Sequence, residues 1–502
     1  MTTTNEEDKK DHSSDAATVA DASMSATSTE AAAQVAGDAN AAEPTTVVGN
    51  ACQLCRRYGR CLEICGYSTV IGVILIWVMI TVGPLKPNYI SIPPPEDEFV
   101  PPPDAWGEAW TYEAPVLERE YIPGLLVNRE NGLELSSGLT ARILATSGIP
   151  VAYDASGEVS NDPFHVLPDG AACFSDPDTE NNPGGWIYAS NSEAKIQGYG
   201  GVGAITFDAD GRVLNYQMVL QGTTMNCGGG KTPWDTWVSC EEWGDNETSW
   251  GQIYQVDPSG QRDPELVTLG KEGGKWESFA YDIRDTQTPY FFVTEDVEDG
   301  ALQRFLPQEV DWDSPWDMLH GDGTTEYLLL SPDDIQRVNG TFEWGTNKTE
   351  AQANAIAYYP NTEGIAVYQE TLFFVCKKIK MIYELNLDTY TYTRKSTRQG
   401  LFDGEPDQLK WLLSNEGADE YLIFTEEGGT KAGVHGRDEN GNYFTLLESS
   451  RYSDETTGLA FNPDFTHLYV AYQQAGLLFD VSRLDGLPLH AKSFDVKYHA
   501  TT

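Results

Sequence analysis

One short apolar pattern recurs six times in the C-terminal part of this 502-residue chain. Each copy is a run of large apolar residues that ends in polar, mostly acidic ones. The copies are "WIYASNSE", "WVSCEEW", "FFVTEDVED", "LFFVCKK", "LIFTEEGG" and "LYVAYQQ", beginning at residues 186, 237, 291, 372, 422 and 468. The intervals between them are 51, 54, 81, 50 and 46 residues. A period close to the length of one four-stranded sheet is typical of a β-propeller, so the pattern predicts an all-β, six-bladed propeller.

The segments between the copies favour the same fold. Runs of Val, Ile, Phe, Tyr and Trp alternate with Asp-Gly, Pro-Asp and Gly-rich turns, as in "ITFDADGRVLNYQMVL". A β-sandwich would not repeat one strand type six times, and an α/β fold would need helices between its strands. We attribute the one long interval to an insertion around residues 310–350.

The acidic ends of the recurring strands predict a cation site. In a propeller, equivalent strands of all blades line the central channel, so their residues converge on one axis. Crowded carboxylates repel one another unless cations neutralise them, and calcium takes carboxylate oxygens in this way. The alternative is that they are solvated surface acids, in a chain with 77 acidic and 32 basic residues. The strand ends supply Glu193, Glu241, Glu242, Glu295, Asp296, Glu426 and Glu427, and earlier positions of the repeats supply Glu277, Glu363 and Glu455.

The stretch "NCGGGKTPWDTWVSCEEW", residues 226–243, departs from this pattern. It carries Cys227 where other repeats place a carboxylate, and a thiolate among carboxylates favours a transition metal. Its glycines allow the backbone to approach the axis without a side-chain clash. We therefore predict that Cys227 is a metal ligand and that Cys240 is a packed strand residue. Disulfide pairing stays open, because four cysteines permit three full pairings among Cys173, Cys227, Cys240 and Cys376.

The first 105 residues differ in composition from the rest of the chain. Residues 1–50 contain no aromatic residue and predict a disordered cytosolic tail. Residues 51–65 combine four cysteines with arginines, which favours palmitoylation or free thiols over a zinc site. Residues 66–85 predict a transmembrane signal anchor. Residues 86–105 are a Pro-rich linker, and residues 106–502 form the predicted propeller.

The charges around the apolar span predict its orientation. Arginines cluster before the span and Lys86 alone follows it, so the positive-inside rule predicts a single-pass type II membrane protein. Its N-terminus would be cytosolic and its C-terminal domain extracellular or lumenal. Three acceptors for N-glycosylation fall on the outer side, at Asn246, Asn339 and Asn347. The net charge of −45 argues against a nucleic-acid partner.

Several strings of the outer domain are similar to one known family. "NCGGGKTPWDTWVSCEE", "EGIAVYQETLFFVCK" and "ETTGLAFNPDFTHLYVAYQQAGLLFDVSR" resemble the PhoX family of alkaline phosphatases, and the resemblance spans about residues 160–490. It implies a six-bladed propeller that holds Fe³⁺ and Ca²⁺ in its channel and hydrolyses phosphate monoesters. It also implies that Cys227 is the iron thiolate and that the carboxylate ligands are Glu193, Glu241, Glu277, Glu295, Glu363, Glu426 and Glu455.

The chain departs from the family at one position. The family phosphatases carry an arginine two residues before the glutamate that matches Glu363, and arginine suits bidentate phosphate binding. Here that place is taken by Asn361, which can donate a hydrogen bond but carries no charge. We assign Asn361 and Lys231 as candidate catalytic residues, with Arg304 as a further candidate cation.

Three functions therefore remain open. The first is a metal-dependent phosphatase that binds a small phosphoester substrate. The second is a propeller hydrolase of another ester or lactone that uses calcium alone, and the third is a non-catalytic calcium-binding surface protein. The chain contains no His-Glu-x-x-His, Gly-x-Ser-x-Gly or Walker motif, so zinc-protease, serine-hydrolase and NTPase interpretations have no support. The sequence does not determine the oligomeric state, and we expect a monomer.

Overall fold

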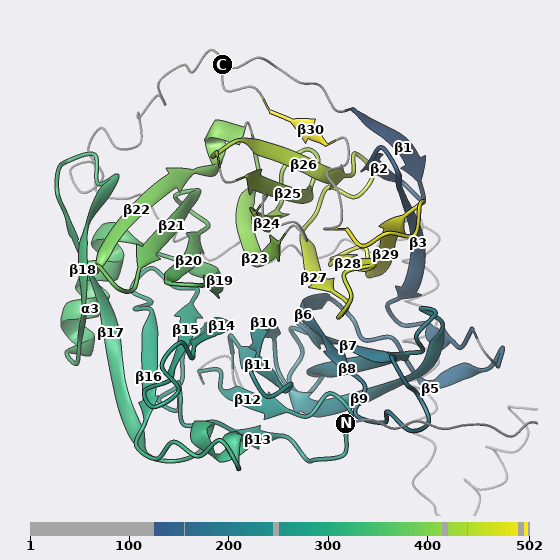
Figure 1. Ribbon diagram of the computed structural model, residues 1–502, viewed down its shortest axis with the longest axis horizontal. Helices are drawn as coiled ribbons and strands as arrows, with labels where there is room; N and C mark the ends of the chain where they lie inside the picture. Colours follow the sequence, from purple (N-terminus) through teal and green to yellow (C-terminus); the bar gives the residue numbers. More distant parts are fainter. Residues whose placement is uncertain are drawn as a thin grey trace, which may run out of the picture. The chain divides into compact units, whose positions relative to one another are not determined.

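Antiparallel meanders follow one another along the chain in the computed structural model (Figure 1). The structure describes residues 125–499, except 155, 244–249, 401, 414–419, 439 and 490–495. All of them belong to the second of two units, Asp97–Thr502. The prediction of an all-β chain with a propeller-like architecture is confirmed for these residues.

Two four-stranded sheets keep their strands in chain order. The first consists of β6 (Pro168–Ser175), β7 (Trp186–Ser192), β8 (Gly200–Phe207) and β9 (Val213–Thr223). The second consists of β10 (Asn226–Lys231), β11 (Trp237–Glu241), β12 (Ile253–Val256) and β13 (Glu265–Leu266). The glycine-rich stretch of the sequence therefore forms the β10–β11 hairpin.

Two further meanders share one nine-stranded sheet, because β18 pairs with β22. One meander contains β14 (Trp276–Asp282), β15 (Tyr290–Glu295), β16 (Gln303–Pro307), β17 (Gly323–Pro332) and β18 (Asn339–Gly345). The other contains β19 (Thr362–Tyr368), β20 (Thr371–Cys376), β21 (Met381–Asn386) and β22 (Thr391–Ser396). The long interval in the sequence is taken up by β17, β18, the 3₁₀ helix η2 (Pro315–Leu319) and the helix α3 (Lys348–Tyr358).

Each of the last two sheets combines strands from the N-terminal and the C-terminal parts of the described chain. Strands β23 (Glu405–Leu413), β24 (Glu420–Glu427), β25 (Gly433–Asp438) and β26 (Tyr443–Glu448) continue into β2 (Leu133–Ser136) and β1 (Leu126–Glu130). The short strand β30 (Lys497–Tyr498) also pairs with β26. Strands β27 (Thr456–Phe461), β28 (His467–Tyr472) and β29 (Leu477–Arg483) are completed by β3 (Leu139–Thr146). The remaining elements are the β4 (Pro150–Ala152) and β5 (Val159–Pro163) hairpin and the 3₁₀ helix η3 (Thr397–Gly400).

The first strand of each meander faces the middle of the arrangement. Within the described residues, β6 contacts β10, and contacts continue through β14, β19, β23 and β27 back to β6. Figure 1 shows these six strands nearest to the centre, with the later strands of each sheet further out. We call them the inner strands. Apolar side chains between adjacent sheets form the core, as between β11 of one sheet and β14 and β15 of the next, where Val238, Trp276 and Val293 are completely buried.

The prediction of a single-pass membrane protein is contradicted. In the part of the chain that the structure describes, no helix is long and apolar enough to cross a membrane. The α-helix found there, α3, has 11 residues and spans about 16 Å, whereas a hydrocarbon core is about 30 Å thick. The predicted span at residues 66–85 lies outside the described residues, as do the predicted tail, the juxtamembrane cysteines and Asn246.

Candidate metal centre

A β-bulge recurs at the same place in all six inner strands of the described chain. The pairing of each inner strand with its neighbour shifts after residue 168, 226, 276, 362, 406 or 457. Bulges turn a side chain out of the regular alternation of a strand and are frequent beside active sites. The residue that follows the shift is a potential metal ligand in five of the six strands: Asp169, Cys227, Glu277, Glu363 and Asp407. The sixth strand has Gly458 there, and Glu455 precedes that strand.

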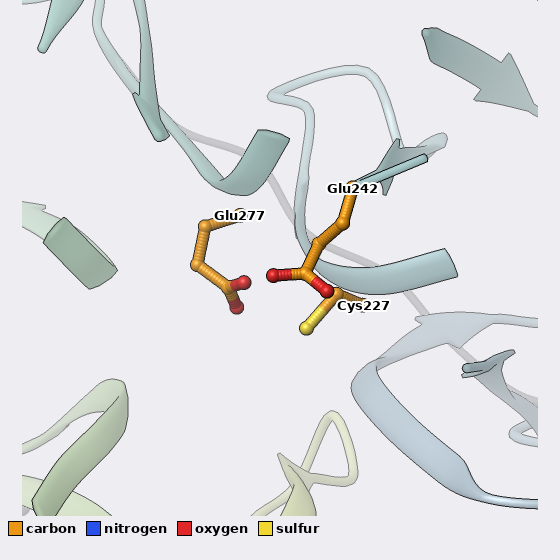
Figure 2. A group of neighbouring side chains, drawn as sticks. All are labelled: Cys227, Glu242 and Glu277. Carbon is orange, nitrogen blue, oxygen red and sulfur yellow. The ribbon is translucent and has the colours of Figure 1, made fainter. Parts of the chain in front are cut away.

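These side chains converge into three overlapping groups, each of which could hold a metal ion. Ligand atoms within 4.8 Å of one another are found in the set Cys227, Glu242 and Glu277, in the set Asp169, Asp407 and Glu455, and in the set Glu277, Glu363 and Asp407. Figure 2 shows the sulfur of the first set and its two carboxylates directed toward one space. Strands distant in sequence therefore assemble one acidic centre.

Glu277 lies at the junction of two groups and indicates that the centre fits a metal. Its side chain is 1% exposed, and neither carboxylate oxygen has a hydrogen-bond partner among the described residues. Burial raises the pKa of Glu277 well above its usual value, and the neighbouring charges of Glu363 and Asp407 raise it further. An unsatisfied buried carboxyl group is costly in a folded protein. Coordination of a cation would give both oxygens a partner and offset the free-energy cost of burying them.

The other carboxyl groups show the same effect. Burial raises the pKa of Asp169 to about 6 and that of Glu242 to about 7. Burial also raises the pKa values of Asp407 and Glu455 well above their usual range, and repulsion from other carboxylates adds to the shift. Perturbed carboxyl groups clustered around one space are typical of functional sites, where a bound cation would restore ionisation.

The thiol of Cys227 is held beside Asp169, to which it donates a hydrogen bond of 3.2 Å. Burial raises the pKa of this thiol well above its usual value, and the charges of Asp169 and Glu277 raise it further. The adjacent glycine, Gly228, permits the strand that carries Glu277 to lie close to Cys227. A Cβ atom on Gly228 would lie 2.6 Å from Oε1 of Glu277, closer than real Cβ contacts. The glycines after Cys227 therefore let β10 and β14 approach each other.

The centre also contains a largely buried cation, Lys377, which directly follows β20. Its ammonium nitrogen lies 2.6 Å from Glu363, 2.7 Å from Asp296 and 3.2 Å from Glu427. Burial alone would lower the pKa of Lys377, but these carboxylates outweigh it and raise the pKa well above its usual value. Asn361 belongs to the same network, because its side-chain amide donates a 2.8 Å hydrogen bond to Asp296.

Two predicted ligands have protein partners of their own. The two carboxylate oxygens of Glu241 accept hydrogen bonds from the backbone amides of Thr224 and Gln252. Glu426 accepts hydrogen bonds from the backbone amide of Gly404 and is 2.8 Å from Nε2 of His435. None of the three metal-compatible groups in the described chain includes Glu241, Glu426 or Glu295.

Glu193 lies at the margin of the centre. It accepts a 2.8 Å hydrogen bond from Gln473. Burial raises its pKa to about 8, and repulsion from Glu242 adds to the shift. The mostly exposed ammonium of Lys195 lies 3.8 Å from its carboxylate. These contacts leave Glu193 close to the acidic groups, although none of the three sets contains it.

The two other candidate cations pair elsewhere. Lys231 lies 2.6 Å from Asp235 and donates to the carbonyl of Cys173. Arg304 pairs with Glu326 at 2.7 Å, and its guanidinium lies over the rings of Tyr290 and Trp344. Cys173, Cys227, Cys240 and Cys376 are all free thiols, so the described cysteines form no disulfide.

Sequence reasoning left Asp169, Asp407 and Lys377 out of the candidate site. Asp169 is followed by glycine and Asp407 is preceded by proline, and such dipeptides are generally typical of turns. The signal that identifies them is their register, since each is the first residue within the bulge, as Cys227 is. Lys377 ends one of the six recurring strands, where other repeats carry acids.

Fold and site together define a propeller-like protein with an acidic, thiol-containing centre. The sequence model of the family described as alkaline phosphatase PhoX matches residues 188–363. This segment contains Cys227, Glu242, Glu277 and Glu363. The resemblance to the PhoX family is thereby confirmed over this segment.

One solved structure of low sequence identity shares the fold, and two others show weaker similarity. PhoX from Pseudomonas fluorescens, in complex with the transition state analogue vanadate, matches with a TM-score of 0.55 and 14% identity, over 75% of this chain and 100% of that chain. Regucalcin, a calcium-binding protein from Agrobacterium tumefaciens, matches with a TM-score of 0.38 and 13% identity, over 70% and 99% of the two chains. A luciferin-regenerating enzyme matches with a TM-score of 0.36 and 10% identity, over 71% and 99%. No curated protein sequence matches significantly.

Proposed function

We propose that this chain is a metal-dependent phosphatase that hydrolyses phosphate monoesters at the centre of a six-bladed propeller. The observation that carries the proposal is the recurrence of ligand-type side chains at the bulge of five inner strands, with the unsatisfied carboxylate of Glu277 among them. The match to alkaline phosphatase PhoX supports the reaction type. Vanadate, bound in the structure of the Pseudomonas protein, is a transition state analogue there.

The donor atoms suggest which cations the centre would take. Asp169, Asp407 and Glu455 offer only carboxylate oxygens, which suit calcium. The set with Cys227 offers a thiolate beside carboxylates and suits iron, which accepts both kinds of ligand. When bound, such ions polarise phosphoryl oxygens and lower the pKa of water.

The chain's own residues would position the substrate. A cleft of about 520 Å³ is lined by Glu427 and Glu455 of the acidic centre and by Arg451 and Tyr452. We assign the alcohol part of the ester to this cleft, where Arg451 would favour a substrate with a second negative group. Lys195, exposed at the margin of the centre, would attract the anionic ester from solvent.

The test is reconstitution of the full chain. Protein stripped with chelator should lack activity on p-nitrophenyl phosphate and regain it with Ca²⁺ and Fe³⁺, with inhibition by vanadate. Glu277→Gln should abolish the regained activity, whereas Glu180→Gln, at an exposed acid, should not. Bound metal without turnover of any phosphate monoester would overturn the proposal.

One observation favours a second candidate function. Asn361 stands in place of the family arginine, and its side-chain amide donates a hydrogen bond to Asp296. The other two candidate cations, Lys231 and Arg304, form ion pairs with Asp235 and Glu326. A centre without an arginine for phosphate suits a calcium-dependent hydrolase of another ester or a lactone. The same reconstituted protein, assayed on carboxyl esters and lactones with calcium alone, separates the two candidates.

A further inference from the structure

Lys377 is surrounded by carboxylates in the way that a metal ion is surrounded by ligands. Its ammonium group lies within ion-pair distance of Asp296, Glu363 and Glu427, at 2.7, 2.6 and 3.2 Å. The lysine side chain is 14% exposed, and those of Asp296 and Glu363 are 11% and 3% exposed. Such contacts are not those of a solvated surface lysine.

The backbone fixes the lysine in this place. The amide of Lys377 donates a 3.1 Å hydrogen bond to the carbonyl of Asn361, and its own carbonyl accepts from the amide of Lys380. Asn361 has a φ of 53°, in the left-handed region that asparagine tolerates better than most residues. Its side chain also holds Asp296. The turn after β20 and the turn before β19 therefore position the ammonium group and one of its carboxylates together.

The number of donors argues against a phosphate-binding role in this arrangement. An ammonium group has three N–H bonds, and three carboxylates lie around that of Lys377. No donor is left for a phosphate oxygen. The three carboxylates, without the lysine, would be the kind of hard oxygen cluster that binds a divalent cation. One of them, Glu363, also belongs to the metal-compatible set with Glu277 and Asp407.

We propose that Lys377 is a tethered cation that fills a divalent-cation position between Asp296, Glu363 and Glu427. The lysine thereby limits how many hard cations, such as calcium, the centre accepts. It also keeps Glu363 neutralised when the neighbouring positions lack metal. The inference rests on the proposed metal centre, but it requires neither phosphatase activity nor iron.

Lys377→Gln and Lys378→Gln form a matched pair for the test. Both remove one positive charge from adjacent residues, but Lys378 is exposed and pairs with Glu405 at the surface. The full chain of each variant is purified in calcium, stripped with chelator and analysed by equilibrium dialysis with calcium alone. Melting temperatures are recorded in chelator and in calcium. Lys377→Arg, which keeps the charge, is the second variant.

The expected result is about one additional calcium ion per chain in Lys377→Gln compared with the wild type. Its melting temperature should fall in chelator and recover in calcium, while Lys378→Gln and Lys377→Arg should bind as the wild type does. An unchanged or lower calcium count in folded Lys377→Gln would overturn the inference. So would failure of this variant to fold in calcium, because calcium should take the place of the ammonium group.

The two proposals fail in different ways. If the wild type binds no calcium but Lys377→Gln binds one ion, the proposed metal-dependent function fails and the tethered cation is supported. If the wild type binds calcium and Lys377→Gln only weakens the binding of inorganic phosphate, Lys377 is an anion ligand and the inference is wrong.

Discussion

The thiol of Cys227 donates a 3.2 Å hydrogen bond to the carboxylate of Asp169. Each is the first residue within the bulge of its strand, in the neighbouring strands β10 and β6. Burial and nearby carboxylates raise the pKa of the thiol well above its usual value, so it is protonated without metal. A metal that takes sulfur must displace this proton, because the thiolate is the ligand.

The first prediction follows from this pair. Loading the chain with Fe³⁺ should produce a visible thiolate-to-iron charge-transfer band and release a proton, and Cys227→Ser should lack the band. Cys240→Ala is the matched control, since Cys240 is buried among Val238 and Ile253 in the apolar core. The control should retain the band at a small cost in stability. A band that persists in Cys227→Ser would exclude this sulfur as an iron ligand.

The second prediction compares two buried glutamates. Glu277 has no hydrogen-bond partner for its carboxylate among the described residues, whereas Glu426 contacts His435 and the amide of Gly404. Glu277→Gln should therefore leave the melting temperature in chelator unchanged or higher, while reducing calcium affinity about tenfold or more. Glu426→Gln should retain calcium affinity but lose about 1–3 kcal/mol of unfolding free energy. Calorimetry and calcium titration of both variants check this, and the reverse pattern would assign the metal to Glu426.

The sequence predicted the strand repeat because each meander presents one nearly buried strand with the same apolar pattern. β7, β11, β15, β20, β24 and β28 contain the six copies. These are second strands, however, and most ligand-type side chains lie on the first strands. A period identifies the repeating unit, but it does not reveal which of its strands faces the axis, because strand order depends on long-range pairing.

The part of the site that sequence reasoning missed depends on backbone geometry. Asp169 and Asp407 become candidates only when the bulge is known, because regular alternation would place their side chains differently. Likewise, nothing in "LFFVCKK" distinguishes the largely buried Lys377 from the exposed Lys378. Single residues beside a bulge or a turn therefore escape a periodic analysis.

The third prediction concerns the glycine after the thiol. A Cβ atom on Gly228 would collide with the carbonyl oxygen of Glu277 and lie 2.6 Å from its carboxylate and 2.7 Å from the hydroxyl of Ser278. Gly228→Ala should therefore separate β10 from β14, abolish binding at the set with Cys227, and lower stability by several kcal/mol. Gly321→Ala is the control, since its Cβ would meet only the carbonyl oxygen of Asp317 at 3.6 Å. Normal iron binding by Gly228→Ala would contradict the close approach.

The fourth prediction is a pH dependence away from the acidic centre. Lys410 lies on the inner strand β23, and burial lowers its pKa to about 8, with repulsion from Lys231 acting in the same direction. An unfolded lysine titrates near 10.4, so below pH about 8 both states carry the charge and the folded state bears the full penalty. Between pH about 8 and about 10.4 the folded state loses its proton first, and the penalty disappears as pH rises.

Lys410→Met should therefore be more stable than the wild type at pH 7, and the difference should shrink steadily as the pH approaches 10. Lys271→Met, which removes an exposed ammonium group, should follow the wild type at every pH. Chemical unfolding of the three proteins in calcium, at intervals between pH 7 and pH 10, measures the difference directly. A constant difference across this range would mean that Lys410 keeps its proton in the folded state, and that Lys410→Met acts through packing alone.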